Sequence, residues 1–302
     1  MDIRTALREG MARLRAAQVP SHTLAAELLL MHTLQHDRTW LYTHPEAPLD
    51  ATAEENYFRL VSRRAAGEPV QYLTGRQEFW GLEFEVTPAV LIPRPETEHL
   101  VEVALDRLGS RGIKINMATG APSAPLHIAE AGTGSGCLAV ALARELPHAE
   151  IFATDISAAA LEVARRNAAR HGVSDRIHFI ECDLLSALRP SISSSQGRAF
   201  FDLVISNPPY IARGEAASLP REVREHEPEL ALYGGETGLE IYRRLIGEAG
   251  DMLDRDGTLV LELGYNLANG VRAILAGDPR WTCVRVTNDL AGIPRVLVAE
   301  RV

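Results

Sequence analysis

Apolar residues recur at helical spacing through the first quarter of the chain. Leu7, Met11 and Leu14 lie three or four positions apart, which places them on one face of a helix, and the same spacing recurs further along. Another amphipathic run covers residues 53–66 and ends before a glycine and a proline. The pattern predicts a small helical bundle over residues 1–75. Its acidic and basic residues are nearly balanced, so docking of a protein partner fits this bundle better than nucleic-acid binding does.

The pattern then changes to an alternation of apolar and polar residues. Phe79, Leu82 and Phe84 occupy apolar positions, and Gly81 stands among them where a turn is needed. We therefore expect a β-hairpin over residues 76–94 that links the bundle to the rest of the chain.

A helix opens directly after the hairpin, in the stretch IPRPETEHLVEVALDRL. Pro95 suits the first helical position, where its missing N–H is not needed, and Glu96 and Glu98 suit the positive end of the helix dipole. Helix capping is a sufficient explanation for these residues.

Apolar strands alternate with helical stretches in the remainder of the chain. The strands are LHIAE, EIFAT, RIHFIE, FDLVIS, GTLVLEL, WTCVRVT and RVLVAER. This alternation predicts an α/β domain over residues 95–302, with a doubly wound, mostly parallel seven-stranded sheet covered by helices on both faces. Only NDLAGIP joins the last two strands, which is too short for a parallel crossover, so the final strand should be antiparallel. Residues 109–125 and 190–199 are predicted to be loops or insertions.

Composition and charge narrow the function classes. The chain has 302 residues, of which 46% are hydrophobic and 24% charged, and no apolar run approaches the ~20 residues of a membrane span. The first residues, MDIRTALREG, lack the apolar region of a signal peptide, which favours a cytoplasmic protein with no membrane partner. The net charge of −9 argues against direct nucleic-acid binding, because proteins that bind the phosphate backbone usually have a basic surface.

The cysteines argue against a disulfide framework and against a zinc site. Cys137, Cys182 and Cys283 are odd in number, far apart and without a CxxC pair. We expect no metal.

A glycine-rich turn between a strand and a helix, in HIAEAGTGSGCLAVALA, is the first candidate for a ligand site. Gly132, Gly134 and Gly136 allow a sharp turn and a close approach of the backbone to a ligand. The dinucleotide pattern GxGxxG would need a third glycine where Cys137 stands. The glycines alone leave the cofactor class open.

Acidic residues at three successive strand ends favour one cofactor. Asp155 is placed to accept both hydrogens of a ribose diol, and Asp183 to accept from an adenine amino group. Glu130, two residues before the first glycine, would repel a pyrophosphate but suits an ammonium group. Three carboxylates suit S-adenosyl-L-methionine, which is cationic and has no phosphate.

The tetrapeptide NPPY follows the fourth strand of the predicted sheet. Each proline fixes φ and lacks an N–H, so the loop is stiff and presents acceptors with few donors. The Asn207 side-chain oxygen and the Pro208 carbonyl can accept two hydrogen bonds, which matches the two donors of a planar –NH2 group, and Tyr210 adds a flat face. Holding both hydrogens would direct the nitrogen lone pair at a sulfonium methyl group, so we predict methyl transfer to a planar nitrogen.

Five stretches of the chain resemble a known family. They are EPVQYLTGRQEFWGLEFEVTPAVLIPRPETEHLVE, GTGSGCLAVALA, SNPPYI, EPELALYGGETGLEIYRRLI and DLAGIPRVLV. Together they resemble the protein-glutamine N5-methyltransferases of the HemK type, which modify the glutamine of the Gly-Gly-Gln loop in peptide chain release factors. Glu130 stands where this family usually has aspartate, and Leu184 stands where some members have an aromatic residue.

The resemblance implies a class I S-adenosylmethionine-dependent methyltransferase that acts on release factors, with the helical bundle as a release-factor docking domain. The expected cofactor contacts are Glu130, Gly132, Thr133, Gly134, Ser135, Gly136, Asp155, Asp183, Leu184 and Asn207, and the expected catalytic and substrate-binding residues are Asn207, Pro208, Pro209 and Tyr210.

Three alternatives remain open. An adenine-N6 methyltransferase acting on DNA or RNA uses the same loop, but it would need base flipping and a basic surface. A glutamine methyltransferase for a ribosomal protein shares the chemistry. A non-catalytic binding module would have no need of an intact NPPY loop and intact acids.

Overall fold

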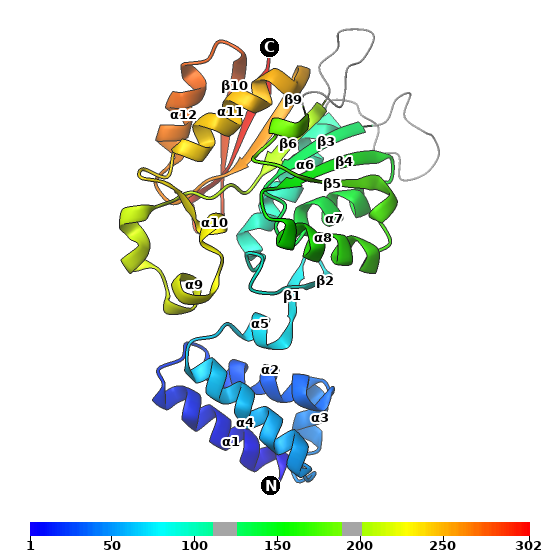
Figure 1. The fold of residues 1–302 in the computed structure, drawn as a ribbon, viewed down its shortest axis with the longest axis vertical. Helices are drawn as coiled ribbons and strands as arrows, with labels where there is room; N and C mark the ends of the chain where they lie inside the picture. Colours follow the sequence, from blue (N-terminus) through cyan, green and yellow to red (C-terminus); the bar gives the residue numbers. More distant parts are fainter. Residues whose placement is uncertain (111–125, 189–200) are drawn as a thin grey trace. The chain divides into compact units, whose positions relative to one another are not determined.

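The computed structural model describes residues 1–110, 126–188 and 201–302 (Figure 1). Two segments predicted to be loops, 190–199 and all but the first two residues of 109–125, lie outside the described residues. Within the described part, no helix combines the length and the apolar character needed to cross a membrane.

The chain forms two compact units, each with its own apolar core. The first comprises residues 1–76 and 219–227, and the second comprises residues 77–218 and 228–302. The helices expected near the N-terminus and the α/β region therefore fall in different units.

The first unit consists of helices around a core that includes Leu29 and Tyr57. Aspartates cap three of them, since Asp2, Asp37 and Asp50 each accept a hydrogen bond of 2.7 Å from the backbone N–H three residues on. The helices are α1 (Ile3–Ala16), α2 (His22–Leu34), α3 (Arg38–Thr43), α4 (Ala51–Ala65), α5 (Val70–Thr74) and, from much later in the chain, α9 (Arg221–His226).

The expected hairpin is present as β1 (Arg76–Phe79) and β2 (Leu82–Glu85). Gly81 has φ of 69°, in the left-handed region that a tight turn requires and that glycine adopts without strain. The Trp80 N–H donates to Glu98 Oε1 at 2.9 Å. Glu98, expected only to favour the helix dipole, therefore also fastens the hairpin to the start of the next helix.

One buried side chain connects the hairpin to the glycine-rich turn. Asn167, in α8 (Ala158–Arg170), accepts a hydrogen bond from the Glu85 N–H at 2.7 Å through Oδ1. Its Nδ2 donates to the Glu85 carbonyl at 2.9 Å and to the Ser135 carbonyl at 2.8 Å. Asn167 is fully buried, so all of these bonds form away from water.

The second unit contains the predicted seven-stranded sheet, in the spatial order β10-β11-β9-β6-β3-β4-β5. Strand β11 is antiparallel to both of its neighbours, and the other adjacent pairs are parallel. The prediction of an antiparallel final strand is thus confirmed, because the short link can only turn back along the preceding strand. The strands are β3 (Leu126–Ala131), β4 (Ala149–Asp155), β5 (Ile177–Glu181), β6 (Phe201–Ser206), β9 (Leu253–Glu262), β10 (Trp281–Asn288) and β11 (Pro294–Arg301).

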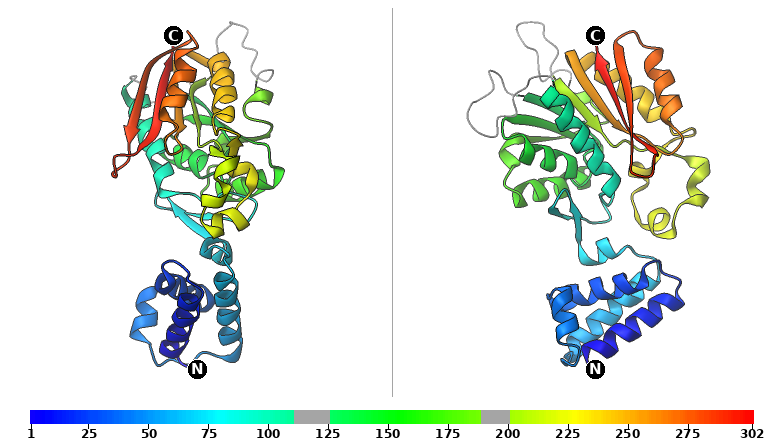
Figure 2. Two further views of the ribbon diagram at one scale, coloured as in Figure 1. Left: turned by 90° about the vertical axis from the view of Figure 1, so that its left-hand side faces the viewer. Right: turned by 180° about the vertical axis from the view of Figure 1, so that it is seen from behind.

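Helices cover both faces of this sheet, as the alternation predicted (Figure 2). Ile128 and Ala129 are neighbours in β3 and belong to separate core clusters, one on each face. One face is covered by α6 (Glu98–Ser110), α7 (Cys137–Glu145) and α8, and the other by α11 (Glu240–Met252) and α12 (Ala268–Ala276).

Short elements connect the strands. A separate pair of parallel strands, β7 (Ile211–Ala212) and β8 (Tyr233–Gly235), begins directly after the NPPY tetrapeptide. The other short elements are η1 (Pro95–Thr97), η2 (Ser174–Arg176), η3 (Ser186–Leu188), η4 (Arg213–Ser218) and α10 (Glu229–Leu232).

Candidate functional site

A cavity of about 430 Å³ opens at the carboxyl ends of the parallel strands. Gly132 follows β3, Asp155 ends β4 and Asn207 follows β6, so adjacent strands bring these residues to one edge of the sheet. Doubly wound sheets bind ligands at this edge, and the volume is that of a small-molecule site. The predicted site residues on its wall are Gly132, Gly134, Asp155, Asp183, Leu184, Asn207 and Pro209.

The glycine-rich turn is held in place by the neighbouring strand β4. The Thr133 N–H donates to the Thr154 carbonyl at 2.8 Å, and the Gly134 N–H donates to Asp155 Oδ2 at 2.9 Å. Gly132 and Gly134 have φ of 72° and 56°, which a residue with a side chain adopts only with strain. The turn therefore brings bare backbone to the cavity wall.

Glu130 lies beneath this turn and is almost completely buried. Its Oε2 accepts a hydrogen bond of 2.7 Å from the hydroxyl of Thr133, which is itself buried. Burial raises the pKa of Glu130 to about 7, against the opposing effect of this hydrogen bond. The geometry shows Glu130 bracing the turn, and its contact with an ammonium group stays a prediction.

Ser135 and Gly136 take part in packing behind the cavity wall. The Ser135 carbonyl accepts the bond from Asn167, and a Cβ on Gly136 would come within 3.0 Å of the Ala164 Cβ. Glycine therefore lets α7 approach α8 closely. Direct cofactor contacts from these two residues also stay predictions.

Asp155 bonds to the neighbouring backbone and also lines the cavity. Its two carboxylate oxygens accept from the N–H groups of Gly134 and Ser157, each at 2.9 Å. Burial raises the pKa of Asp155, and these two backbone hydrogen bonds oppose the rise. A carboxylate has about four acceptor sites, so two remain for a ligand in the cavity that Asp155 lines.

Asp183 and Leu184 reach the cavity after β5. Asp183 forms an ion pair with Arg244 at 2.6 Å, and both residues line the cavity. Leu184 has φ of 50°, a strained conformation for leucine, and the Thr154 hydroxyl donates to its carbonyl at 2.6 Å. Contacts such as this hydrogen bond hold the chain in its strained path at the cavity edge.

The NPPY loop borders the same cavity. Asn207 and Pro209 lie on the wall, whereas Pro208 is buried. A Cβ on Gly234 would come within 2.5 Å of the Pro209 carbonyl, so only glycine permits the approach of β8 to this loop.

The Tyr210 side chain contacts residues that lie outside the cavity wall. Its hydroxyl lies 3.4 Å from Glu262 Oε1, to which it donates, and its ring packs against Gly264 and Leu267. Burial raises the pKa of the phenol. Among the described residues Tyr210 does not line the cavity, so its stacking on a substrate stays a prediction.

Sequence reasoning missed several residues of the site. Leu230 and Arg244 line the cavity, although no local pattern distinguishes them. Thr97 contacts Asn207, and Glu262 contacts Thr97. Thr97 belongs to the PRPETE stretch, for which helix capping was a sufficient explanation, so the sequence gave no reason to expect these contacts. Within the described ranges, no cluster of histidines, cysteines and carboxylates could hold a metal ion.

Solved methyltransferase structures share the fold. The chain is similar to the METTL16 catalytic domain in complex with a MAT2A 3′UTR hairpin, with a TM-score of 0.54 and 17% identity over 79% of this chain and 81% of that chain. The N-terminal domain of human METTL16 in complex with SAH matches with a TM-score of 0.50 and 17% identity, over 89% of each chain. At this identity the likeness concerns the fold alone.

Proteins found by sequence comparison have a much higher identity to this chain than these solved structures do. The family model of the PrmC N-terminal domain matches residues 5–75, and that of the methyltransferase small domain matches residues 116–223. The release factor glutamine methyltransferase of Koribacter versatilis is 42% identical over 301 residues, which are 100% of this chain and 99% of that protein. Its counterpart from Chlorobaculum tepidum is 44% identical over 274 residues, or 91% and 88% of the two chains. With this identity over nearly the full length of both chains, the chain belongs to the family of release factor glutamine methyltransferases.

Proposed function

We propose that this protein transfers the methyl group of S-adenosyl-L-methionine to the side-chain amide nitrogen, N5, of the glutamine in the Gly-Gly-Gln motif of peptide chain release factors. The main support is the position of the NPPY loop. Asn207 and Pro209 border the cavity that Gly132 and Asp155 also line. An amide receptor and a nucleoside site thus share one space.

The residues present fit this cofactor. The Asp155 carboxylate has free acceptor sites for the ribose hydroxyls, and the turn at Gly132 and Gly134 admits a ligand close to the backbone. Asp183 is available for the adenine amino group through the lone pairs that Arg244 leaves free. When bound, the cofactor would supply an electrophilic methyl group.

Replacement of Asp155 is expected to weaken cofactor binding. Asp155→Ala removes the ribose acceptors and the bond to the Gly134 N–H, and a charge-assisted hydrogen bond is worth about 1.5–3 kcal/mol. Since about 1.4 kcal/mol is a factor of ten, the dissociation constant of S-adenosylmethionine should rise at least about tenfold in a calorimetric titration. Asp175→Ala, at an exposed position in η2, is the matched control. An unchanged constant for Asp155→Ala would remove this residue from the site.

The protein has to make an amide nitrogen reactive. Its lone pair is delocalised, so acceptors that hold both N–H groups orient the lone pair and stabilise the positive charge that develops on nitrogen. Asn207 Oδ1 and the Pro208 carbonyl take these roles in the proposal. These two acceptors would hold the nitrogen toward the methyl group that the bound cofactor would supply, and the nitrogen proton would pass to solvent after transfer.

Methyl transfer to purified candidates tests the proposal. The protein is incubated with methyl-labelled cofactor and with a release factor, a ribosomal protein fraction or adenine-containing duplex DNA. Mass spectrometry should find a single methyl group on the Gly-Gly-Gln glutamine of the release factor. Label on a ribosomal protein or on DNA, with none on the release factor, would favour one of the rival substrates instead.

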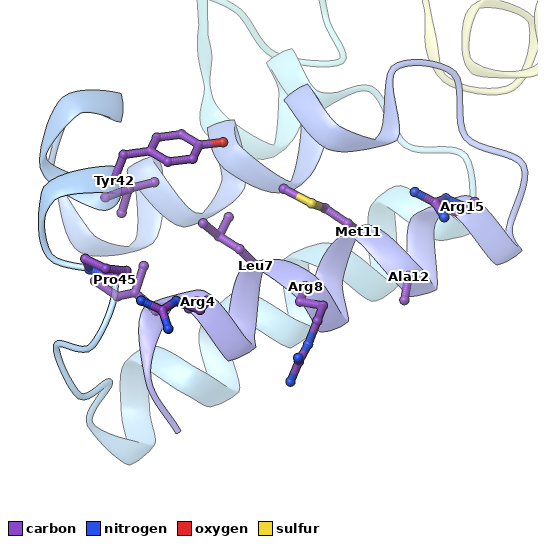
Figure 3. A pocket seen from close by; sticks show the side chains of 10 residues that line it. Arg4, Leu7, Arg8, Met11, Ala12, Arg15, Tyr42 and Pro45 are labelled. Carbon is purple, nitrogen blue, oxygen red and sulfur yellow. The ribbon is translucent and has the colours of Figure 1, made fainter.

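We also propose that the helical unit docks the release factor through a groove between α1 and α3 (Figure 3). This cavity, of about 430 Å³, has a floor that includes Leu7 and Met11. Its charged wall residues are Arg4, Arg8 and Arg15, although the chain as a whole has a net charge of −9. A segment of the factor that combines apolar and acidic side chains is complementary to this groove.

Reversal of one charge in the groove is expected to weaken binding of the release factor and to leave the rate of methyl transfer unchanged. Arg4 pairs with Glu46 and Arg15 with His22, whereas Arg8 has no partner among the described residues. Arg8→Glu should raise KM for the intact factor by about three- to tenfold while kcat stays unchanged, because an exposed charge pair contributes about 0.2–1 kcal/mol and the reversal adds repulsion to its loss. A Gly-Gly-Gln peptide should be methylated equally by both proteins. Arg272→Glu, exposed in α12, is the control, and an unchanged KM for Arg8→Glu would reject this groove.

A further inference from the structure

The side chain of Asn207 is held from the side opposite the cavity. Its Nδ2 donates to Thr97 Oγ1 at 3.1 Å, and the Thr97 hydroxyl donates to Glu262 Oε2 at 2.7 Å. Thr97 and Glu262 are both buried, and neither lines the cavity. A hydrogen-bonded chain therefore runs from the end of β9, through η1, to the NPPY loop.

Proton counting fixes the direction of every bond in this chain. An ionised Glu262 can only accept, so the single hydroxyl proton of Thr97 must point at it. Thr97 Oγ1 then offers only lone pairs to Asn207, and the edge of the amide that faces it must be the NH2 group. The other edge, Oδ1, is left for the cavity. Among the described residues no side chain or backbone group donates to it.

Glu262 is itself held by surrounding groups. The Tyr242 hydroxyl donates to the Glu262 carbonyl at 2.7 Å, and the Tyr210 hydroxyl lies 3.4 Å from Oε1. Burial raises the pKa of Glu262 to about 7, opposed by the Thr97 hydrogen bond and the nearby charge of Arg295. The carboxylate thus prevails above neutral pH. Its cost of burial is reduced by the donors aimed at it.

We propose that Thr97 and Glu262 are positioning residues that hold the Asn207 amide with Oδ1 toward the substrate nitrogen. This proposal rests on the proposed function, in which Oδ1 accepts from the substrate amide. A reversed Asn207 amide would oppose its NH2 group to the NH2 group of the substrate. Two donors would then face each other, and the substrate nitrogen would lose the acceptor that stabilises its developing charge.

Removal of the Thr97 hydroxyl tests the proposal. In Thr97→Val the side chain keeps its shape, but a methyl group faces Asn207 Nδ2. A buried NH2 group without an acceptor is costly, so the side-chain amide of Asn207 should flip by about 180° and exchange the positions of its oxygen and its NH2 group. At a pH above the pKa of Glu262, kcat on the intact release factor should fall at least about tenfold, with KM for the factor and the cofactor dissociation constant changed by less than about twofold.

The matched control restores the hydroxyl. Thr97→Ser keeps the donor and the acceptor and should retain kcat within about threefold of the original protein, although it also loses a buried methyl group. Should Thr97→Val not fold, Thr97→Ala is the second hydroxyl-free variant and is judged in the same way. A hydroxyl-free variant as fast as the original protein, or a serine variant as slow as valine, overturns the positioning role. Failure of the unmodified protein to methylate the glutamine would instead overturn the proposed function, so the two failures are distinguishable.

Discussion

Asn207→Ala is expected to lower kcat on release factor by about 10²–10³-fold, the scale observed when one pre-organised hydrogen-bonding group is removed from a transition state. Asn207 ends the hydrogen-bonded chain from Glu262 and Thr97, which in our proposal holds its oxygen toward the substrate nitrogen. Its contribution grows as positive charge develops on the substrate nitrogen, so the loss should appear mainly in kcat and less in KM.

Measurements on the same variant separate this effect from damage to the fold. The unfolding temperature should stay close to that of the original protein, because Asn207 is only half-buried. Cofactor titration should show a smaller change than the rate does. Asn56→Ala, at an exposed position in α4, is the control and should leave both rate and binding unaltered. Turnover near the original level in Asn207→Ala would mean that other groups hold the amide.

Replacement of the substrate glutamine should have the largest effect of all. A release factor with glutamate in place of the Gly-Gly-Gln glutamine is expected to accept no methyl group. Glutamate has no N–H donors for the NPPY loop, and its negative charge would face the acceptor carbonyl of Pro208. Labelled cofactor and mass spectrometry of the loop peptide give the measurement.

Three samples make this comparison decisive: the natural factor, its glutamate variant and adenine-containing duplex DNA. The glutamate variant should still compete with the natural factor, since the groove between α1 and α3 would bind both. Equal label on the two proteins would show modification elsewhere on the factor. Label on the DNA would restore the nucleic-acid alternative, which the net charge of −9 disfavours.

The local sequence pattern was sufficient to predict the fold and part of the candidate site. The glycine-rich turn and Asp155 follow strand ends, and parallel strands bring their ends to one edge whatever the details of packing. Long-range contacts were not predictable in the same way. Thr97 contacts Asn207 across 110 residues of sequence, and the helix capping predicted for its own segment gave no reason to expect that contact.

The directions of side chains were the second feature that the sequence could not predict. The sequence predicts that Tyr210 offers a flat face to the substrate, and it gave no sign of the close packing on Gly264 or of the bond to Glu262. The contact predicted between Glu130 and a ligand stays a prediction, and the hydrogen bond from Thr133 to Glu130 could not be foreseen. Each outcome depends on which neighbours fill the nearby space, and the pattern of a single segment does not contain that information.

The three bonds of Asn167 also bear on how the protein opens. Because one buried side chain satisfies backbone groups of both the hairpin and the glycine-rich turn, separating either segment from α8 leaves polar atoms of Asn167 without partners and weakens the anchor of the other segment. Local unfolding of the two segments is therefore coupled, and they form one cooperative unit in hydrogen exchange. A ligand that orders the turn would slow exchange at Glu85 in the hairpin, although it touches no residue there.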